Sequence, residues 1–167
     1  MHRQYIGQGA SKRNRRVKKT GKQSIGRSRG GLTTKIHMVT SSDRSVVTFS
    51  LTPGSAHDAP ECLALLDSME CVDGTILLMD RAYEGDNVRT KAMEKGFVPV
   101  VPPKKNRRTP WEYDRELYKR RNEIERFFLR LKRFRKVFTR YDKLDVLFMG
   151  VIFFALIADA LVSVNSL

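Results

Sequence analysis

Four residues between positions 118 and 132 have side chains and a spacing that suit chemistry on a phosphate group. Tyr118, Arg121, Glu125 and Lys132 lie in a segment without Gly or Pro that is filled with strong helix formers. On a helix, these four side chains fall within about 60° of one another. One carboxylate in line with two cations and a phenol suits a group that binds a metal ion while its neighbours bind phosphate. An amphipathic helix with a charged face explains the same spacing.

Asp80 is a second candidate because of the strand expected before it. Thr75–Met79 is a short, continuous apolar run, which is typical of a central strand buried on both faces. A carboxylate directly after such a strand lies at the carboxyl edge of the sheet, where open α/β sheets place their active sites. A turn aspartate with no chemical role is the alternative.

The spacing of the first four residues resembles the signature around the last catalytic acid of bacterial DDE (Asp-Asp-Glu) transposases, in particular the family of insertion sequence five. Other segments resemble the same family, and together they extend over most of the chain: residues 24–37, 51–58, 79–83, 101–110 and 140–144. The resemblance implies a ribonuclease-H-like fold, a mixed sheet flanked by helices. It also implies an enzyme of DNA transposition that cuts and joins transposon-end DNA.

By this resemblance, Asp80 and Glu125 are catalytic acids and metal ligands. The implied reaction is a phosphoryl transfer with two divalent ions, Mg²⁺ or Mn²⁺, held by three carboxylates. The resemblance further assigns Tyr118, Arg121 and Lys132 to the binding of transposon-end DNA.

The family's first catalytic Asp has no counterpart in this sequence. It ends the first strand of the family's sheet, whereas no Asp or Glu precedes Asp43 here, and Asp43 falls in a predicted hairpin turn. We therefore expect a fold that lacks the usual first strand, a catalytic domain incomplete at its N-terminus, and a chain that is inactive or very weak alone. A second reading frame, completed by an upstream-frame product, and a truncated remnant both explain this pattern.

Two other functions are compatible with parts of the sequence. A non-catalytic transposase remnant would bind DNA through its basic surface without a divalent metal. A resolvase-type endonuclease would prefer branched DNA, but the joint match of several segments favours a transposase.

The net charge of +14 and the pI near 10.2 favour a polyanionic partner, most simply DNA, here transposon ends and target. Residues 1–32 contain no acid and are predicted to form a basic arm or loop. A second basic loop follows two prolines at residues 104–108. The residues that we expect to bind DNA in these segments are Arg27, Arg29, Lys104, Lys105, Arg107 and Arg108.

No signal-peptide pattern is present, and an uncharged run at residues 146–158 is too short to span a bilayer. We expect that run to form a helix buried against the sheet, and a cytoplasmic, nucleoid-associated protein without a membrane partner. The family resemblance also implies that the protein forms a homodimer in a synaptic complex.

The remaining patterns predict an α/β domain over residues 33–167. A hairpin at residues 33–51 precedes a helix at 59–69 that Asp58 caps. Asp86 is expected to cap a helix at residues 87–95, which Gly96 ends before a strand at 97–101. A long helix is expected from about residue 109 to Lys132.

Overall fold

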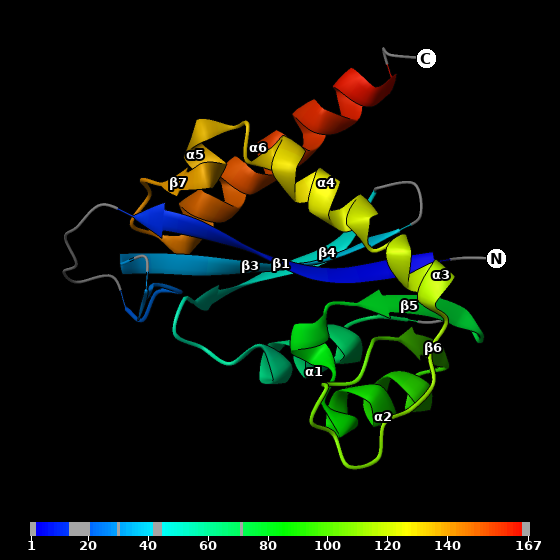
Figure 1. Cartoon of the computed structure of the whole chain (residues 1–167). Helices are drawn as coiled ribbons and strands as arrows, with labels where there is room; N and C mark the ends of the chain where they lie inside the picture. Colours follow the sequence, from blue (N-terminus) through cyan, green and yellow to red (C-terminus); the bar gives the residue numbers. More distant parts are fainter. Residues whose placement is uncertain (1–2, 14–20, 30, 42–44, 71, 165–167) are drawn as a thin grey trace. The chain divides into compact units, whose positions relative to one another are not determined.

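The computed structural model describes residues 3–13, 21–29, 31–41, 45–70 and 72–164 (Figure 1). Asp43 and, within the predicted arm, residues 1–2, 14–20 and 30 lie outside these ranges. In chain order the elements are β1 (Arg3–Arg13), β2 (Gly26–Ser28), β3 (Gly31–Ser41), β4 (Val46–Pro53), α1 (Asp58–Asp67), β5 (Thr75–Met79), the 3-10 helix η1 (Arg81–Tyr83), α2 (Asp86–Glu94), β6 (Phe97–Val100), α3 (Arg115–Lys119), α4 (Asn122–Leu131), α5 (Arg135–Phe138), β7 (Thr139–Arg140) and α6 (Asp145–Val164).

The strands form one mixed sheet in the order β2-β3-β1-β5-β6, and β4 pairs with β3 while β7 pairs with β1. The pairs β1–β5 and β5–β6 are parallel, whereas β2–β3 is antiparallel. This arrangement confirms the predicted α/β class, a mixed sheet with helices. It also confirms the hairpin, since β3 and β4 are its two strands.

The N-terminal segment is the main correction to the sequence analysis. We expected residues 1–32 to form a basic arm or loop, but Arg3–Arg13 is a strand. That the sheet lacks the family's usual first strand stays a prediction. Its residues Arg3 to Ile6 pair in parallel with Ile76 to Met79 of β5. β1 is polar and glycine-containing, so it has no apolar pattern to reveal it. Ladder hydrogen bonds from a neighbour that is distant in the sequence stabilise it instead.

Contacts divide the chain into two units, which we describe separately. The first unit consists of Met1–Gln8, His37–Ser50 and His57–Glu125, and the second of Gly9–Ile36, Leu51–Ala56 and Arg126–Leu167. In the first unit, α1 and α2 lie beside each other on one side of β5 and β6 (Figure 1). The predicted boundary at residue 32, with one domain over residues 33–167, stays a prediction.

The core of the first unit lies on both faces of β1 and β5. All five residues of β5 are buried, as its apolar run predicted. Ile6 belongs to a buried cluster with Leu66 of α1 and Leu77 of β5. On the opposite face of β1, a Cβ atom at Gly7 would come within 3.0 Å of the Ile124 side chain. The sheet therefore has a helix against each face, which explains why its central strand is apolar throughout.

Helix boundaries differ from the sequence analysis in three places. Asp58 and Asp86 are the first residues of α1 and α2, so the N-caps are His57 and Gly85, not these aspartates. Residues 101–114 form an irregular segment, and α3 begins only at Arg115, after Asp114 accepts a hydrogen bond from Leu117 N at 2.9 Å. The predicted long helix is also divided into α3 and α4.

In the second unit, Arg140 is a fully buried cation, and it belongs to a segment that resembles the transposase family. Its Nη1 donates to Thr34 Oγ1 at 2.8 Å and its Nη2 to Asp145 Oδ1 at 2.6 Å. Burial acts to raise the pKa of Asp145, but hydrogen bonds from Ser24 and Arg140 hold it below its ordinary value. Arg140 therefore has a structural role in joining β3, β7 and α6.

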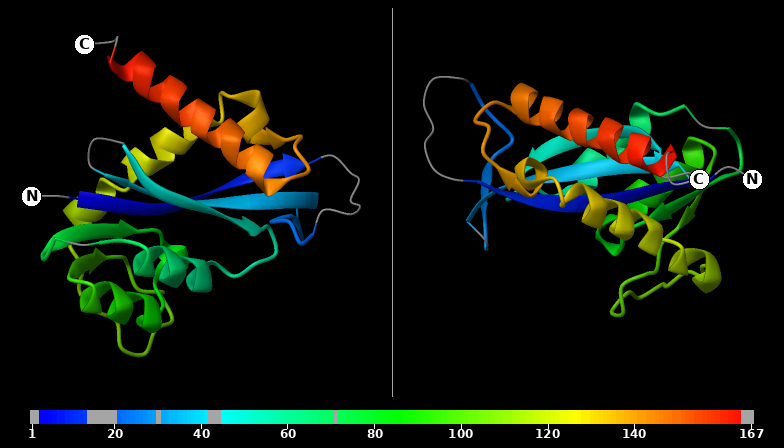
Figure 2. Two further views of the ribbon diagram at one scale, coloured as in Figure 1. Left: turned by 180° about the vertical axis from the view of Figure 1, so that it is seen from behind. Right: turned by 90° about the horizontal axis from the view of Figure 1, so that it is seen from above.

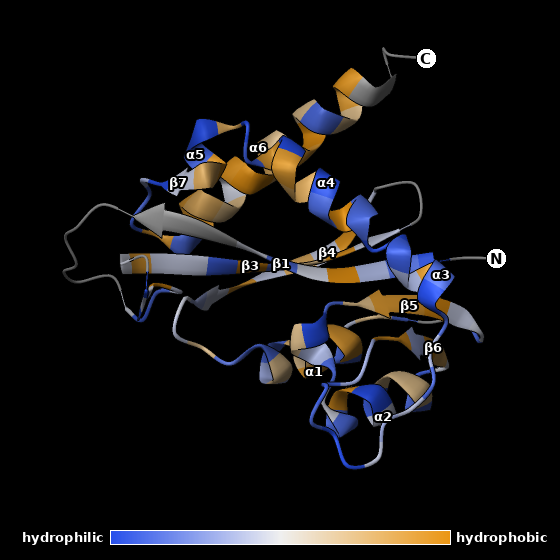
Figure 3. Cartoon of the chain, in the orientation of Figure 1, coloured by the Kyte–Doolittle hydropathy of each residue, from blue (hydrophilic) through white to orange (hydrophobic). Residues whose placement is uncertain are grey.

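Helix α6 is exposed over most of its length, which corrects the expectation of a helix buried against the sheet. Phe148, Ile152 and Ala155 are buried, but Phe154 and Leu161 are 69% and 61% exposed. Figure 2 shows one uninterrupted helix, and Figure 3 shows that it is hydrophobic along most of its course. The helix extends beyond the uncharged run at residues 146–158 that we judged too short, and its length and composition would allow it to cross a membrane. Core helices of soluble proteins meet the same criterion, so this feature alone assigns no membrane role.

Candidate active site

Asp80 lies directly after β5, at the position predicted from the sequence. Its backbone N–H donates to Ile6 O at 3.1 Å, and its carbonyl accepts a hydrogen bond from Tyr83 N at 2.9 Å. These two bonds fix the turn from β5 into η1 beside β1. The Asp80 side chain is 30% exposed. A fully buried strand thus delivers one carboxylate to the solvent edge of the sheet.

The side chain of Tyr83 holds this turn in place from the interior of the protein. Its side chain is fully buried, and its hydroxyl lies 2.8 Å from Nδ1 of the buried His37. Burial is the main cause that raises the pKa of Tyr83 above its ordinary value, and nearby groups including Asp80 act in the same direction. The phenol is therefore neutral across the physiological range. It holds η1 against β3 while Asp80 remains accessible.

Arg121 connects Asp80 with Glu125. Its Nη2 lies 2.9 Å from Glu125 Oε1 and its Nη1 lies 3.9 Å from Asp80 Oδ1. The guanidinium carbon is 5.4 Å from the centre of the Tyr118 ring. The Arg121 side chain is 17% exposed, whereas that of Glu125 is 54% exposed. The structure therefore brings Asp80, Tyr118, Arg121 and Glu125 together in the first unit.

The backbone between Tyr118 and Glu125 is not the continuous helix that we predicted. Arg121 N donates to Tyr118 O at 2.9 Å, and Ile124 N donates to Arg121 O at 3.1 Å. Both bonds span three residues, so a tight turn replaces the α-helical repeat here. Tyr118 and Arg121 nevertheless remain neighbours, because residues three apart lie on the same face in either geometry. Glu125 stays beside Arg121 through their ion pair at 2.9 Å.

Opposing effects determine the pKa of Arg121. Burial acts to lower the pKa, but Tyr118, Asp80 and Glu125 together raise it above its ordinary value. Burial raises the pKa of Tyr118 against the opposing effect of Arg121. The cluster thus contains a permanent cation and a neutral phenol beside two carboxyl groups. Such a guanidinium can bind a carboxylate or a phosphate through two parallel hydrogen bonds.

The donor set fits one hard divalent ion better than two. Asp80 and Glu125 supply carboxylate oxygens, and Mg²⁺ commonly uses one or two carboxylates together with water and substrate phosphate. Across the residues that the structure describes, no group of three His, Cys, Asp or Glu side chains is placed to hold a metal ion. Three carboxylates for a two-ion centre are therefore not assembled within that part of the chain.

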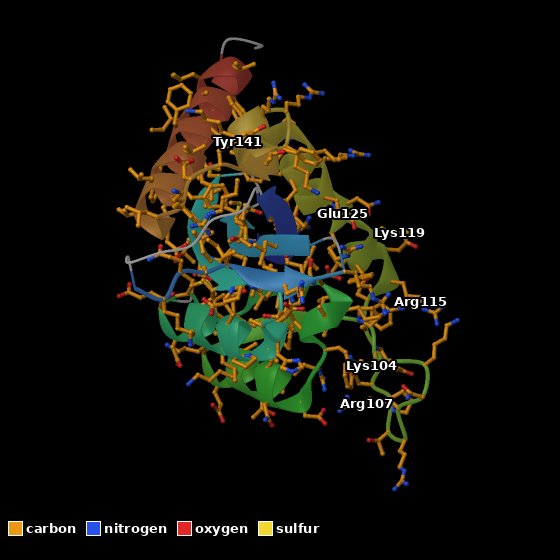
Figure 4. All side chains as sticks on the ribbon, turned by 90° about the vertical axis from the view of Figure 1, so that its left-hand side faces the viewer. Lys104, Arg107, Arg115, Lys119, Glu125 and Tyr141 are labelled. Atoms are coloured by element: carbon orange, nitrogen blue, oxygen red, sulfur yellow. The ribbon has the colours of Figure 1, made fainter. Side chains whose placement is uncertain are left out.

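The cations of the loop at residues 104–108 do not behave alike. Lys104 and Arg107 both form ion pairs with Glu84, at 2.8 and 3.1 Å. Lys105 and Arg108 are exposed. Figure 4 shows Lys104 and Arg107 on this loop and Arg115 and Lys119 on α3, along the same edge of the view as Glu125. The loop therefore presents only part of its predicted DNA-binding set to solvent.

The other predicted DNA-binding residues belong to the second unit. Arg27 in β2 and Arg29 after it are exposed, and Lys132 is half-buried just beyond the end of α4. Lys132 N donates to Phe128 O at 2.9 Å, which continues the last turn of α4. The assignment of these three residues to DNA binding stays a prediction.

Sequence reasoning missed the surroundings of Trp111 and Glu84. Arg89 and Arg107 lie over the Trp111 ring, with their guanidinium carbons 3.6 and 4.4 Å from its centre. Glu84 is only 3% exposed. An acid directly after the Asp80–Tyr83 segment, and a lone Trp in a loop of Pro, Lys and Arg, were the available signals. Neither signal identifies its partners, because the partners of Glu84, and Arg89 beside Trp111, lie about twenty residues away along the chain.

Two comparisons of the sequence with known proteins point to one family. Residues 8–158 match a family model described as a transposase DDE domain. A putative transposase for insertion sequence element IS6501 from Brucella ovis is 32% identical over 128 residues, which cover 74% of this chain and 95% of that protein. Among solved structures, the chain resembles the piggyBac transposase in a synaptic complex with hairpin DNA, with a TM-score of 0.48 and 10% identity. That similarity covers 64% of this chain and only 24% of the piggyBac chain.

Proposed function

Because this chain belongs to the family of transposase DDE domains, we propose that it acts in DNA transposition, with Asp80 and Glu125 as two acids of a metal-dependent phosphoryl transfer. The observation that supports this site is the position of Arg121, whose guanidinium reaches both carboxylates across the end of β5. A strand-end aspartate and a helix glutamate thus lie beside one cation.

The family uses divalent metal ions, and we assign Mg²⁺ or Mn²⁺ to Asp80 and Glu125. When bound, such an ion would activate a water or a DNA 3′-hydroxyl and stabilise the leaving oxygen. The side chain of Arg121 is suited to bind a phosphate oxygen and to orient Glu125, because its planar group offers parallel donors. Tyr118 packs beside Arg121 and limits the directions in which the guanidinium can point.

DNA is the proposed partner, in the form of transposon ends and target. The net charge of +14 supports it, and so do the exposed cations Arg27, Arg29, Lys105 and Arg108. We further propose a homodimer in a synaptic complex, a nucleoid-associated location in the cytoplasm, and a need for a third acid from an upstream-frame product. Size-exclusion chromatography with light scattering, with and without transposon-end DNA, tests the dimer.

The test of the site is Mn²⁺ binding by calorimetry to the full chain and to two variants, Asp80→Asn and Glu125→Gln. Both should weaken Mn²⁺ binding because each removes a carboxylate. Glu112→Gln is the matched control, since Glu112 is exposed and precedes α3. If all three variants bind Mn²⁺ like the unmodified chain, the assigned metal site is wrong.

We expect little or no strand transfer by the isolated chain, because its sequence aligns only two of the family's three acids. A strand-transfer assay with Mg²⁺ and transposon-end DNA measures this. Robust turnover would contradict the expectation and would mean that another residue completes the site.

One observation favours a second function, DNA binding without catalysis. Among the residues that the structure describes, no three His, Cys, Asp or Glu side chains lie together in a way that could hold a metal ion. A remnant of this kind would bind DNA equally well with EDTA and with Mg²⁺. Its DNA affinity would also be unchanged by Asp80→Asn and Glu125→Gln.

A further inference from the structure

The buried carboxylate of Glu84 is the centre of a cluster that the proposed reaction does not use. Glu84 Oε1 pairs with Lys104 Nζ, and Glu84 Oε2 pairs with Arg107 Nη1. Lys104 N also points at Glu84 Oε2, at 3.4 Å. The Glu84 side chain is 4% exposed, so an unpaired charge here would be costly. Two of the four loop cations are thus committed to neutralising one buried acid.

Trp111 extends this cluster along the loop at residues 101–114. Its indole Nε1 donates to Val101 O at 2.8 Å, which closes the loop on itself. Arg107 contacts the Trp111 ring with the same guanidinium that pairs with Glu84 and Asp86. Arg89 of α2 lies over the ring as well. The loop is therefore fastened at its start, its middle and its end.

The fastened loop leads directly to the candidate active site. Tyr113 stacks edge-on against Tyr118, with ring centres 5.7 Å apart, and Tyr118 contacts Arg121. Glu84 itself follows η1, the turn that begins with Asp80. A continuous set of contacts thus runs from the Asp80 turn through the loop and back to Arg121, all within the first unit.

We propose that Glu84 is a positioning residue that sorts the cations of this loop into an inner pair, Lys104 and Arg107, and an outer pair, Lys105 and Arg108. The inner pair fastens the loop, and the outer pair contacts DNA phosphate. This inference rests on the proposed function only for the outer pair. It differs from the expectation that all four cations bind DNA.

The sorting follows from charge and exposure. Arg107 is 18% exposed and contacts two acids and an aromatic ring, so phosphate would have to displace all three. Lys104 is more exposed, yet both its ammonium and its backbone N–H face Glu84. Lys105 and Arg108 are exposed. Neither forms a salt bridge with a residue that the structure describes.

Trp111 is the single tryptophan of the chain and reports on the cluster directly. The experiment combines its fluorescence and acrylamide quenching with DNA binding, measured by anisotropy on a fluorescent duplex at several salt concentrations. Lys105→Ala and Arg108→Ala should each reduce the slope of log affinity against log salt by about 0.9. Their Trp111 emission should not change. Lys104→Gln should leave the salt slope unchanged.

Glu84→Gln should shift Trp111 emission to longer wavelength and increase its quenching. It should also make the salt slope steeper, because Lys104 and Arg107 become available to phosphate. A merely structural residue would weaken binding without a steeper slope. Glu84→Asp keeps the charge and should restore part of the emission. Asp86→Asn is the control for the loss of an acid that pairs with Arg107. It should leave the Trp111 emission unchanged, because the Asp86 side chain is 68% exposed.

Three results would overturn the inference. One is Trp111 quenching that is the same in Glu84→Gln as in the unmodified chain. Another is a salt slope that falls with Lys104→Gln as much as with Lys105→Ala. This second test uses an exposed residue, so it stands even if Glu84→Gln does not fold. The third is unchanged DNA binding in both outer-pair variants. If the unmodified chain does not bind DNA at all, the proposed function fails, while the quenching data still decide whether Glu84 fastens the loop.

Discussion

At the scale of single residues, Arg121 sets the electrostatics of the candidate site. It is the cation that Asp80 and Glu125 share, and its raised pKa keeps it charged at every working pH. A guanidinium in this position neutralises part of the charge that a divalent ion would meet. It also offers donors to a phosphate once the carboxylates bind a metal. Arg121 therefore opposes metal binding alone and supports binding of metal together with DNA.

The first prediction concerns Arg121. Arg121→Ala should raise the Mn²⁺ affinity of the DNA-free chain, by up to about tenfold or about 1.4 kcal/mol, because two carboxylates lose their resident cation. Arg121→Lys keeps the charge and should remain close to the unmodified chain. Calorimetric titration with Mn²⁺ measures both. An affinity that falls in Arg121→Ala would mean that Arg121 orients the carboxylates more than it neutralises them.

The second prediction concerns Glu84 and pH. Burial acts to raise the pKa of Glu84, but Lys104 and Arg107 outweigh it, and the pKa lies below its ordinary value of 4.5. Since the folded-state pKa is the lower one, the stabilisation is complete above about pH 5 and is lost as the pH falls through the lowered pKa. The free energy of unfolding should therefore decrease below about pH 4.5.

Urea denaturation from pH 3 to pH 7 measures this dependence. Glu84→Gln should be less stable than the unmodified chain at neutral pH, and the difference should narrow as the pH falls. Asp145 has a lowered pKa as well, so Glu84→Gln should flatten the pH dependence only in part. A difference in stability that stays constant with pH would show that folding does not lower the pKa of Glu84.

At the scale of elements, β5 is the support for the site. Its five residues are buried, it pairs in parallel with β1 and β6, and it ends at Met79, directly before Asp80. The segment before Arg121 is not part of the sheet. The ion pairs of Glu84 and the contact between the Tyr113 and Tyr118 rings hold it in place. One acid thus lies on a rigid strand, and Arg121 depends on a fastened loop.

The third prediction tests β5. Leu77 has no exposed surface and belongs to the main cluster of the first unit, so Leu77→Ala should lower the free energy of unfolding by about 2–5 kcal/mol. Val98 on the neighbouring strand β6 is 48% exposed, and Val98→Ala is the control. It should cost less than about 1 kcal/mol. Equal costs for the two variants, from urea denaturation, would show that β5 is not the centre of this core.

At the scale of the whole molecule, the excess of positive charge dominates. Thirty-two Lys and Arg face eighteen Asp and Glu. Several cations form ion pairs within the fold: Arg140 pairs with Asp145, and Arg130 pairs with Asp159. The exposed remainder creates a positive field that attracts DNA of any sequence and raises the rate of encounter.

The fourth prediction follows from this field. Binding to a duplex of arbitrary sequence should weaken steeply with salt, by about 10³-fold or more between 50 and 200 mM if six or more phosphates are contacted. Anisotropy titrations over that range measure the slope. Lys91→Ala is a control for charge, because Lys91 pairs with Asp67 at 2.7 Å. A flat salt dependence would argue against a phosphate-dominated interface.

Local patterns in the sequence were sufficient for part of the fold and of the site. The apolar run at Thr75–Met79 predicted the central strand and the place of Asp80, because such a run is typical of a strand buried on both faces. The amphipathic pattern before Lys132 agrees with α4, whose buried face consists of Ile124, Phe127, Phe128 and Leu131. The family resemblance, carried by spacing along single segments, pointed to the transposase family.

Only the tertiary structure decided which distant residues meet. β1 has no apolar periodicity and exists through its pairing with β5, so no local pattern could show it. The exposure of α6 depends on what packs against it and not on its own composition. Lys104 and Arg107 differ from the other cations of their loop because they pair with Glu84, about twenty residues earlier in the chain. A sequence by itself determines periodicity and charge, whereas partners across the chain follow from the folded geometry that brings buried charges to their counter-ions.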